Sequence, residues 1–211
     1  MRFSLWFDEH TANDVLPRLR AAAEALPPEA VQRGVRQWTV QALEWSEPPL
    51  LEESAESAER ASEPEGSMVE AGATIEVAIA HLAEFAQADC ACSLEMEWML
   101  WEFGDEGWKQ TPHAVICRSL GPEFGGGTAA ADEGQVLIEL GGDEPFVAER
   151  APWDVSTRRR LQANILQLLA LCHAVQRRLQ PVRRKLWSES EADWTEKLAL
   201  RLQNTEGVWI Q

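Results

Sequence analysis

The N-terminal part of the chain alternates between strand-like and helix-like spacing of its apolar residues. "RFSLWF" (2–7) has an apolar residue at every second position, which predicts a half-buried strand. Apolar residues then recur at helical spacing over 15–26, behind Thr11 and Asp14, whose spacing resembles a capping box. "VRQWTVQALEW" (35–45) is rich in β-branched and aromatic residues and predicts a second strand.

Two segments interrupt this regular pattern. Pro27-Pro28 is expected to end the first helix, because proline lacks the backbone N–H that a helix needs. In "SEPPLLEESAESAERASEPEGSM" (46–68) Glu, Ser and Ala dominate, and the apolar groups are too few to offset the entropy of ordering the chain. We therefore predict a flexible acidic connector over 46–68, with a frayed helix over 51–61 as an alternative. This segment could act as an acidic arm that binds a basic partner, but we favour the simpler interpretation of a solvated loop.

The central part of the chain predicts a helix followed by antiparallel strands. Helical spacing favours a helix over 72–88, although alternation leaves a strand open for its first half. "CSLEMEWMLWEFGDEGW" (92–108) alternates and ends in a Gly-Asp-Glu-Gly turn, which predicts a hairpin. Its return strand carries Pro112, which indicates an edge or a bulge, and "QVLIEL" (135–140) predicts a further strand after a Gly-rich loop.

The C-terminal part of the chain predicts a helical pair over 153–203. An apolar stripe at helical spacing runs along the first helix, and two further leucines extend it nearly around, so we expect deep burial. Pro181 is expected to end or kink this helix. A last helix is predicted to begin near Ser188. The stripe consists of Leu161, Ile165, Leu168, Leu169, Cys172, Val175 and Leu179, the two further leucines are Leu166 and Leu171, and the last helix would use Trp194, Leu198 and Leu202.

This order of elements predicts an α+β fold. We expect a single domain over 1–211, with an antiparallel sheet of about five strands and helices packed mainly on one face. The first two strands alone would make too small a sheet to be stable, which argues against a separate N-terminal domain.

The charge of the chain restricts its partners. It carries 35 acidic against 19 basic residues, a formal net charge of -16. The balance is -21 over 1–149 and +5 over 150–211. Such a chain repels nucleic acid and anionic membrane surfaces and attracts basic proteins. The basic clusters over 157–162 and 177–185 are therefore expected to neutralise the chain's own acidic sheet or to flank a buried helix. No membrane span, signal segment or disulfide framework is evident, so we expect a cytoplasmic protein.

No catalytic or metal-binding motif is present, so we expect neither an enzyme nor a cofactor. The four cysteines lack the C-x-x-C spacing of structural zinc sites and are expected to be buried small hydrophobes. In one strand, His113 and Cys117 would lie about 13 Å apart, too far for a thiol–imidazole pair. The Gly-rich stretches lack the lysine of a phosphate-binding loop and the spacing of a dinucleotide fingerprint.

The strongest candidate site is the face of the predicted hairpin on which carboxylates grade into aromatic rings. Glu95 and Glu97 could form an acid/base pair, but we favour the interpretation of a solvated strand face. Carboxyl groups with the shifted pKa values that catalysis needs are found in clefts. Trp101 and Phe103 lie either under a helix or exposed beside these acids, and an apolar patch rimmed by charge is typical of protein-binding sites. We therefore predict partner binding by Glu95, Glu97, Trp101, Phe103 and Trp108.

The preferred functional hypothesis is a module that binds a basic protein through this acidic and aromatic face. In composition the chain is similar to many bacterial toxin-neutralising (immunity) proteins, although no motif carries the similarity; an adaptor is equally compatible. The competing hypothesis is a ligand-binding protein or enzyme with a carboxylate-lined pocket between sheet and helices, using Glu95, Glu97 or Glu139 with His113. A homodimer formed through the apolar helix over 161–179 stays open as a third hypothesis.

Overall fold

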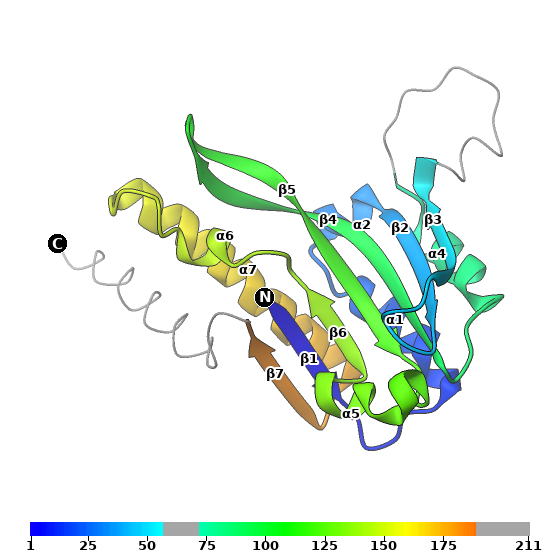
Figure 1. The fold of residues 1–211 in the computed structure, drawn as a ribbon. Helices are drawn as coiled ribbons and strands as arrows, with labels where there is room; N and C mark the ends of the chain where they lie inside the picture. The colour runs from blue at the N-terminus through cyan, green and yellow to red at the C-terminus, as the bar shows by residue number, and fades with distance from the viewer. Residues whose placement is uncertain (57–71, 189–211) are drawn as a thin grey trace.

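The computed structural model describes residues 1–56 and 72–188, which form one seven-stranded antiparallel sheet (Figure 1). The strand order is β3-β2-β4-β5-β6-β1-β7. The α+β class is confirmed, but the expected number of about five strands is wrong, because β3 and β7 were not predicted as strands. The strands are β1 (Arg2–Trp6), β2 (Val35–Ala42), β3 (Pro49–Ser54), β4 (Cys90–Gly104), β5 (Gly107–Leu120), β6 (Val136–Glu139) and β7 (Arg183–Trp187).

The helices lie mainly on one face of the sheet, which we name the inner face. The main core packs β-strand side chains such as Trp38 and Leu94 against Leu19 of α1, Leu82 of α4 and Leu168 of α7. The opposite, outer face is covered in part by η2 and α5, which enclose a small second cluster. The helices are η1 (Ala12–Asp14), α1 (Val15–Ala23), α2 (Pro28–Arg33), α4 (Ile75–Ala83), η2 (Phe124–Gly127), α5 (Ala129–Glu133), α6 (Glu144–Val147) and α7 (Val155–Leu179).

The first strand is buried on both faces rather than half-buried. Phe3 and Leu5 face the main core as predicted. Ser4 and Trp6 on the other face are also buried, because α5 lies against them and the Trp6 indole donates to the carbonyl of Ala131 at 2.9 Å. Alternation alone implied one exposed face, and α5 covers that face.

The helix predicted behind Thr11 and Asp14 is present but shorter than expected. The Asp14 carboxylate accepts hydrogen bonds from both the backbone N–H and the hydroxyl of Thr11, at 2.8 and 2.7 Å. Helix α1 ends at Ala23, before the prolines, and Pro28 instead begins α2. Proline is tolerated at the first helical position, where its missing N–H has no helical acceptor in any case.

Part of the predicted acidic connector is a strand. β3 pairs antiparallel with β2, and Gln37 and Trp38 of β2 donate to Glu52 and Glu53 at 2.6 and 2.9 Å. The backbone hydrogen bonds to β2, together with apolar burial, therefore offset the entropy cost of ordering this segment. The part of the connector over 57–68 lies outside the described residues. The segment predicted as helix or strand after it is helix α4, capped by the Thr74 hydroxyl.

The hairpin of β4 and β5 is the longest pairing in the sheet. Its register runs without interruption from Ala91↔Leu120 to the turn at Gly104↔Gly107. β6 pairs with β5 only over Ile116–Ser119, so Pro112 lies where that side of β5 has no strand partner among the described residues. This position fits the edge predicted for the proline. The tip of the hairpin extends past the neighbouring strands in Figure 1.

A buried asparagine closes the free side of β4. β2 pairs with β4 no further than Met96, so the part of β4 beyond Met96 has no strand partner on that side within 1–56 and 72–188. There the Asn164 amide of α7 accepts from the N–H of Trp101 at 3.0 Å and donates to its carbonyl at 2.7 Å. It also donates to the carbonyl of Pro145 at 2.7 Å. One side chain therefore joins β4, α6 and α7.

Helix α7 is buried on one side only, which corrects the expectation of deep burial all round. Leu161, Ile165 and Leu168 are buried, whereas Leu166 is 53% exposed and Leu169 is 36% exposed. The helix ends at Leu179, and β7 follows where the predicted helical pair would continue. The last predicted helix lies outside the described residues. Within 1–56 and 72–188, no helix combines the length and apolar character that a membrane crossing requires.

Replacing Asn164 with leucine should destabilise the protein strongly. Leucine is nearly isosteric, but it would leave the N–H and C=O of Trp101 and the C=O of Pro145 without their partner. Each buried unsatisfied group costs about 1–3 kcal/mol, so we expect the free energy of unfolding to fall by about 2–4 kcal/mol. Equilibrium unfolding in urea measures this free energy. The matched control is Gln176→Leu on the exposed side of the same helix, which should change stability by less than about 0.5 kcal/mol. Equal effects of the two variants would contradict the role of Asn164.

Candidate functional site: an acidic surface at the edge of the sheet

Glu95 and Glu97 of the predicted site lie on the outer face of the sheet, but their electrostatic surroundings differ. The Glu97 carboxylate is 3.1 Å from the Arg36 guanidinium and 3.5 Å from that of Arg33. Glu95 lies opposite Gln37 of β2 and Ile116 of β5, and it forms no ion pair with another described residue. Glu97 is therefore neutralised within the molecule, whereas Glu95 keeps its negative charge available.

The three aromatic residues of the predicted site are half-buried beside the first turns of α7. The Arg160 guanidinium lies over the Trp101 ring, 4.8 Å from its centroid. Phe103 and Trp108 pack edge to face with centroids 5.6 Å apart, and the Trp108 indole donates to the buried Thr157 hydroxyl at 3.1 Å. These rings are thus neither fully covered nor freely exposed.

The five predicted residues do not form one compact site. Glu95 and Trp101 are six residues apart on one strand, about 20 Å along its length. The aromatic end of the hairpin lies next to basic side chains of α7, so the acidic and aromatic features that the sequence placed together separate into two regions. The structure brings Phe103 next to Trp108, and each of the other three has different neighbours.

A second surface combines exposed apolar groups with unneutralised acids. It lies on the turn from β2 to β3 and on β3 itself, which is an edge strand of the sheet. We name it the acidic edge surface. It consists of Leu43, Glu44, Trp45, Glu47, Leu50 and Glu52, all of them exposed. Leu43 and Leu50 expose 57% and 54% of their surface, and Trp45 exposes 40%. Large apolar side chains that gather among charges are typical of protein-binding sites.

The acidic edge surface is held in a fixed conformation by its neighbours. Leu43 has a φ of 59°, a left-handed conformation that is strained for a leucine. Two backbone hydrogen bonds hold it there, from its N–H to the carbonyl of Asp89 at 2.9 Å and from the N–H of Gly125 to its carbonyl at 2.7 Å. The Trp45 ring packs edge to face on the buried Phe124, with centroids 4.7 Å apart. Backbone strain of this kind is often found at functional sites, so the exposed Leu43 side chain is a candidate contact for a partner.

The carboxylates of this surface have no cation beside them. Among the described residues, no lysine or arginine forms an ion pair with Glu44, Glu47 or Glu52. Arg118 lies over the Trp45 ring, but its guanidinium is paired with Glu139 at 3.2 Å. In the sequence, Glu44 falls in the predicted strand over 35–45, and Glu47 and Glu52 fall in the predicted acidic connector over 46–68. The signal that could have marked them is the stretch over 43–53, which holds four acids, three leucines and a tryptophan and no basic residue.

A pocket of about 460 Å³ lies on the outer face near β1 and β7. Register places Ile116, Glu139, Arg2 and Trp187 in one row across four strands. The Glu139 carboxylate is bonded by Arg2 at 2.8 Å and by Arg118 at 3.2 Å. This carboxylate, which the sequence made a candidate for chemistry, is therefore neutralised by two guanidiniums.

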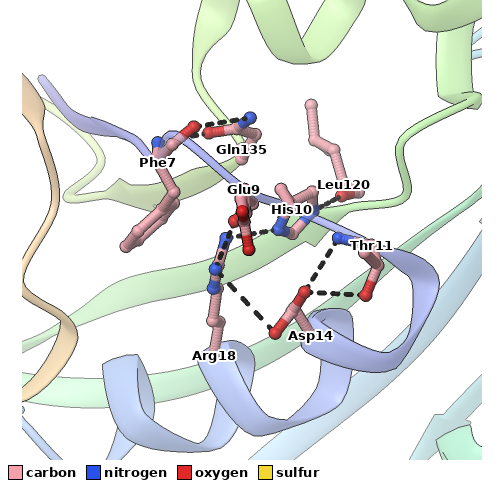
Figure 2. A network of polar contacts seen from close by, with 8 residues as sticks. All are labelled: Phe7, Glu9, His10, Thr11, Asp14, Arg18, Leu120 and Gln135. Carbon is pink, nitrogen blue, oxygen red and sulfur yellow. Dashed lines mark hydrogen bonds and ion pairs between the residues drawn. The ribbon is translucent and has the colours of Figure 1, made fainter.

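His10 forms a network that the sequence analysis did not identify. Figure 2 shows its imidazole between α1 and the end of β5. Nε2 is 2.6 Å from the carbonyl of Leu120 and Nδ1 is 2.6 Å from Arg18 Nη1. Burial lowers the pKa of His10, with a smaller contribution from Arg18 in the same direction. No periodic pattern distinguishes such a residue, because its partners are 8 and 110 positions away.

The other histidine of interest, His113, lies in a network without the geometry of a catalytic triad. The Thr111 hydroxyl is 2.9 Å from both His113 Nε2 and the Glu102 carboxylate. Nucleophilic catalysis requires the imidazole between the hydroxyl and the acid, whereas here the hydroxyl lies between them. Burial lowers the pKa of His113, although Glu102 opposes the shift.

The cysteines are free thiols that are protonated at neutral pH. Burial raises the pKa of Cys92, Cys117 and Cys172 to about 12, and it also raises that of Cys90. The thiolate is the reactive form, so none of the four is poised as a nucleophile. Over 1–56 and 72–188, no group of three or more His, Cys, Asp and Glu side chains is arranged to hold a metal ion.

The raised thiol pKa values predict slow alkylation of the native protein. At pH 7.5 we expect iodoacetamide to modify all four cysteines at least roughly tenfold more slowly in the native protein than in urea, because both the thiolate fraction and access are reduced. Intact-mass spectrometry over time measures the rates, with the urea-unfolded chain as the control. Rapid modification of the fully buried Cys117 in the native protein would contradict this account.

Comparisons with known proteins identify no relative. No protein-family model matches the chain, no curated protein matches its sequence, and no solved structure matches its fold.

Proposed function

We propose that the chain is a protein-binding module whose acidic edge surface engages a basic protein partner. The observation that carries the proposal is the exposure of Leu43, Trp45 and Leu50 beside three carboxylates that lack cations. Apolar groups supply affinity when they are buried in an interface, and the surrounding charge steers association with a partner of opposite sign. A toxin-neutralising protein and an adaptor both fit this description.

The position of the surface supports the proposal. β3 is an edge strand, and edge strands accept further strands or flat partner surfaces unless they are blocked. Pro49 and Glu52 discourage pairing of β3 with a further strand, so its exposed Leu50 and Glu52 favour contact with a flat basic surface instead. Glu95 extends the negative charge across the outer face of β4, because it lies opposite Gln37 of β2, which in turn bonds Glu52. Trp101, Phe103 and Trp108 are a second contact region in this proposal.

Charge reversal at the acidic edge surface should abolish partner binding. The test variant is Glu44→Lys/Glu47→Lys/Glu52→Lys, compared with wild type in affinity capture from the native cell extract followed by mass spectrometry. The matched control, Glu29→Lys/Glu76→Lys/Glu84→Lys, makes the same charge change at exposed positions on the helices. We expect a basic protein that wild type and the control retain and the test variant loses, with affinity weakened roughly tenfold or more.

Further variants separate the two contact regions. Leu50→Ser should weaken binding of the same protein without changing its salt dependence, and Trp101→Ala with Glu95→Lys tests the hairpin. The proposal fails if no captured protein depends on either region, or if the control loses the partner as completely as the test variant.

The pocket near β1 and β7 favours a small-ligand site as the second candidate function. It places Arg2, Glu139 and Trp187 around a volume of about 460 Å³, and the Arg2 guanidinium lies over the Trp187 ring. This pocket lies on the outer face, not between sheet and helices as the sequence analysis expected. If it binds a ligand, a thermal-shift screen of metabolites and nucleotides should give at least one saturable increase in melting temperature, which Arg2→Gln removes. Flat melting curves together with a tight protein complex would exclude this candidate.

A further inference from the structure

The loop between β1 and α1 is held to the rest of the molecule by two side-chain clamps. Gln135 receives the N–H of Phe7 at 2.6 Å and donates to its carbonyl at 3.4 Å. Three residues further on, His10 reaches the carbonyl of Leu120 at the end of β5. Arg18 of α1 completes the second clamp by donating to His10 Nδ1 and to the carbonyl of Glu9, each at 2.6 Å (Figure 2).

These contacts determine the protonation state of His10. A guanidinium carries donors and no acceptor, so His10 Nδ1 must be the acceptor of the contact with Arg18. The carbonyl of Leu120 is an acceptor, so Nε2 must carry the proton. Only the neutral imidazole with its hydrogen on Nε2 satisfies both contacts.

Protonation of His10 is incompatible with the contact to Arg18. A second proton would place an N–H on Nδ1, directed at an N–H of Arg18 across 2.6 Å. Two donors and two positive charges at this distance repel each other, and the half-buried site offers little water to screen them. The Arg18 guanidinium is also stacked on the Phe7 ring at 3.9 Å, so it cannot withdraw without losing that contact.

We propose that His10 and Arg18 form a pH-sensitive latch that holds the segment over 7–14 against β5 at neutral pH and releases it in mildly acidic solution. The charged groups that act on His10 are Arg18 from α1 and Asp14 from η1, and β5 contributes the carbonyl of Leu120. The hydrogen bond to the Leu120 carbonyl and the charge of Asp14 favour the imidazolium, but Asp14 is already engaged by both donors of Thr11 and by Arg18 at 3.8 Å. Burial and Arg18 oppose the imidazolium. This inference is independent of the partner proposed above.

The direction of the effect on stability follows from linkage. The pKa of His10 is lowered in the folded protein relative to the value of about 6.5 for an unperturbed histidine. The unfolded chain therefore binds the proton more readily than the folded chain. The stabilising contribution of the neutral latch is present above pH about 6.5 and is lost as the pH falls below that value toward the folded-state pKa.

The test is an NMR titration of the wild-type protein between pH 7.5 and 5, together with hydrogen exchange of the backbone amides. We expect the His10 ring resonances to titrate with a midpoint below about 6.5 and the amides over 8–14 to lose protection with the same midpoint. Arg18→Met removes the opposing cation and should raise the His10 midpoint, a change that a purely structural role would not produce. A wild-type midpoint at or above 6.5, or protection that does not change with the titration, would overturn the proposal.

A non-titrating variant provides an independent readout. His10→Gln keeps an amide donor near the carbonyl of Leu120 but cannot gain charge. Its melting temperature should fall less between pH 7 and 5 than that of wild type. The matched control is His173→Gln, which removes a histidine from the exposed side of α7 and should keep the wild-type pH dependence. An equal pH dependence in all three proteins would overturn the latch. If His10→Gln does not fold, the NMR titration of the wild-type protein still tests the latch.

Discussion

The outer half of β4 depends on one asparagine. A strand of 15 residues exposes a long row of backbone groups, and β2 satisfies one side of that row only as far as Met96. Beyond this point the side chain of Asn164 takes the place of a strand at Trp101, because its amide offers an acceptor for the Trp101 N–H and a donor for the Trp101 C=O. A helix could pack against this edge through apolar side chains alone, but it would then bury the N–H and C=O of Trp101 unpaired. Trp108 joins the hairpin to α7 at a second point, through the hydrogen bond from its indole to the Thr157 hydroxyl.

The charges of the molecule are sorted along the sheet. Arginines gather on the outer face of β5 and β1, where two of them neutralise Glu139, while the edge at β3 carries carboxylates without cations. The net charge of -16 is therefore not spread evenly over the surface. A partner with a positive surface is attracted toward β3. It is repelled by β7, whose exposed residues include Arg183, Arg184 and Lys185. The proposed function depends on this sorting rather than on the total charge.

Much of the fold could be predicted because its central elements have strong periodicity. The alternation is regular over β4, and the turn between β4 and β5 has two glycines in the required places. The edge strands could not be predicted in the same way. β3 and β7 carry mostly charged or proline-rich sequence, since an edge strand needs only one side of its backbone paired and few apolar contacts. Helix α7 shows the converse error. Its leucines surround the helix, but the sheet buries only one side of it, so Leu166 and Leu169 are exposed.

The sequence by itself determined the α+β class, the central hairpin, and the presence of unbalanced acids beside tryptophans, because these features are properties of neighbouring residues. Only the tertiary structure decided which acids are neutralised. Glu97 meets Arg36 across 61 positions of the chain, and Glu139 of β6 meets Arg2 near the N-terminus. One contact of His10 has the same origin, because its acceptor at Leu120 is brought to it by the sheet. Pairing between distant groups depends on strand order, and the order β3-β2-β4-β5-β6-β1-β7 is not encoded in any local pattern.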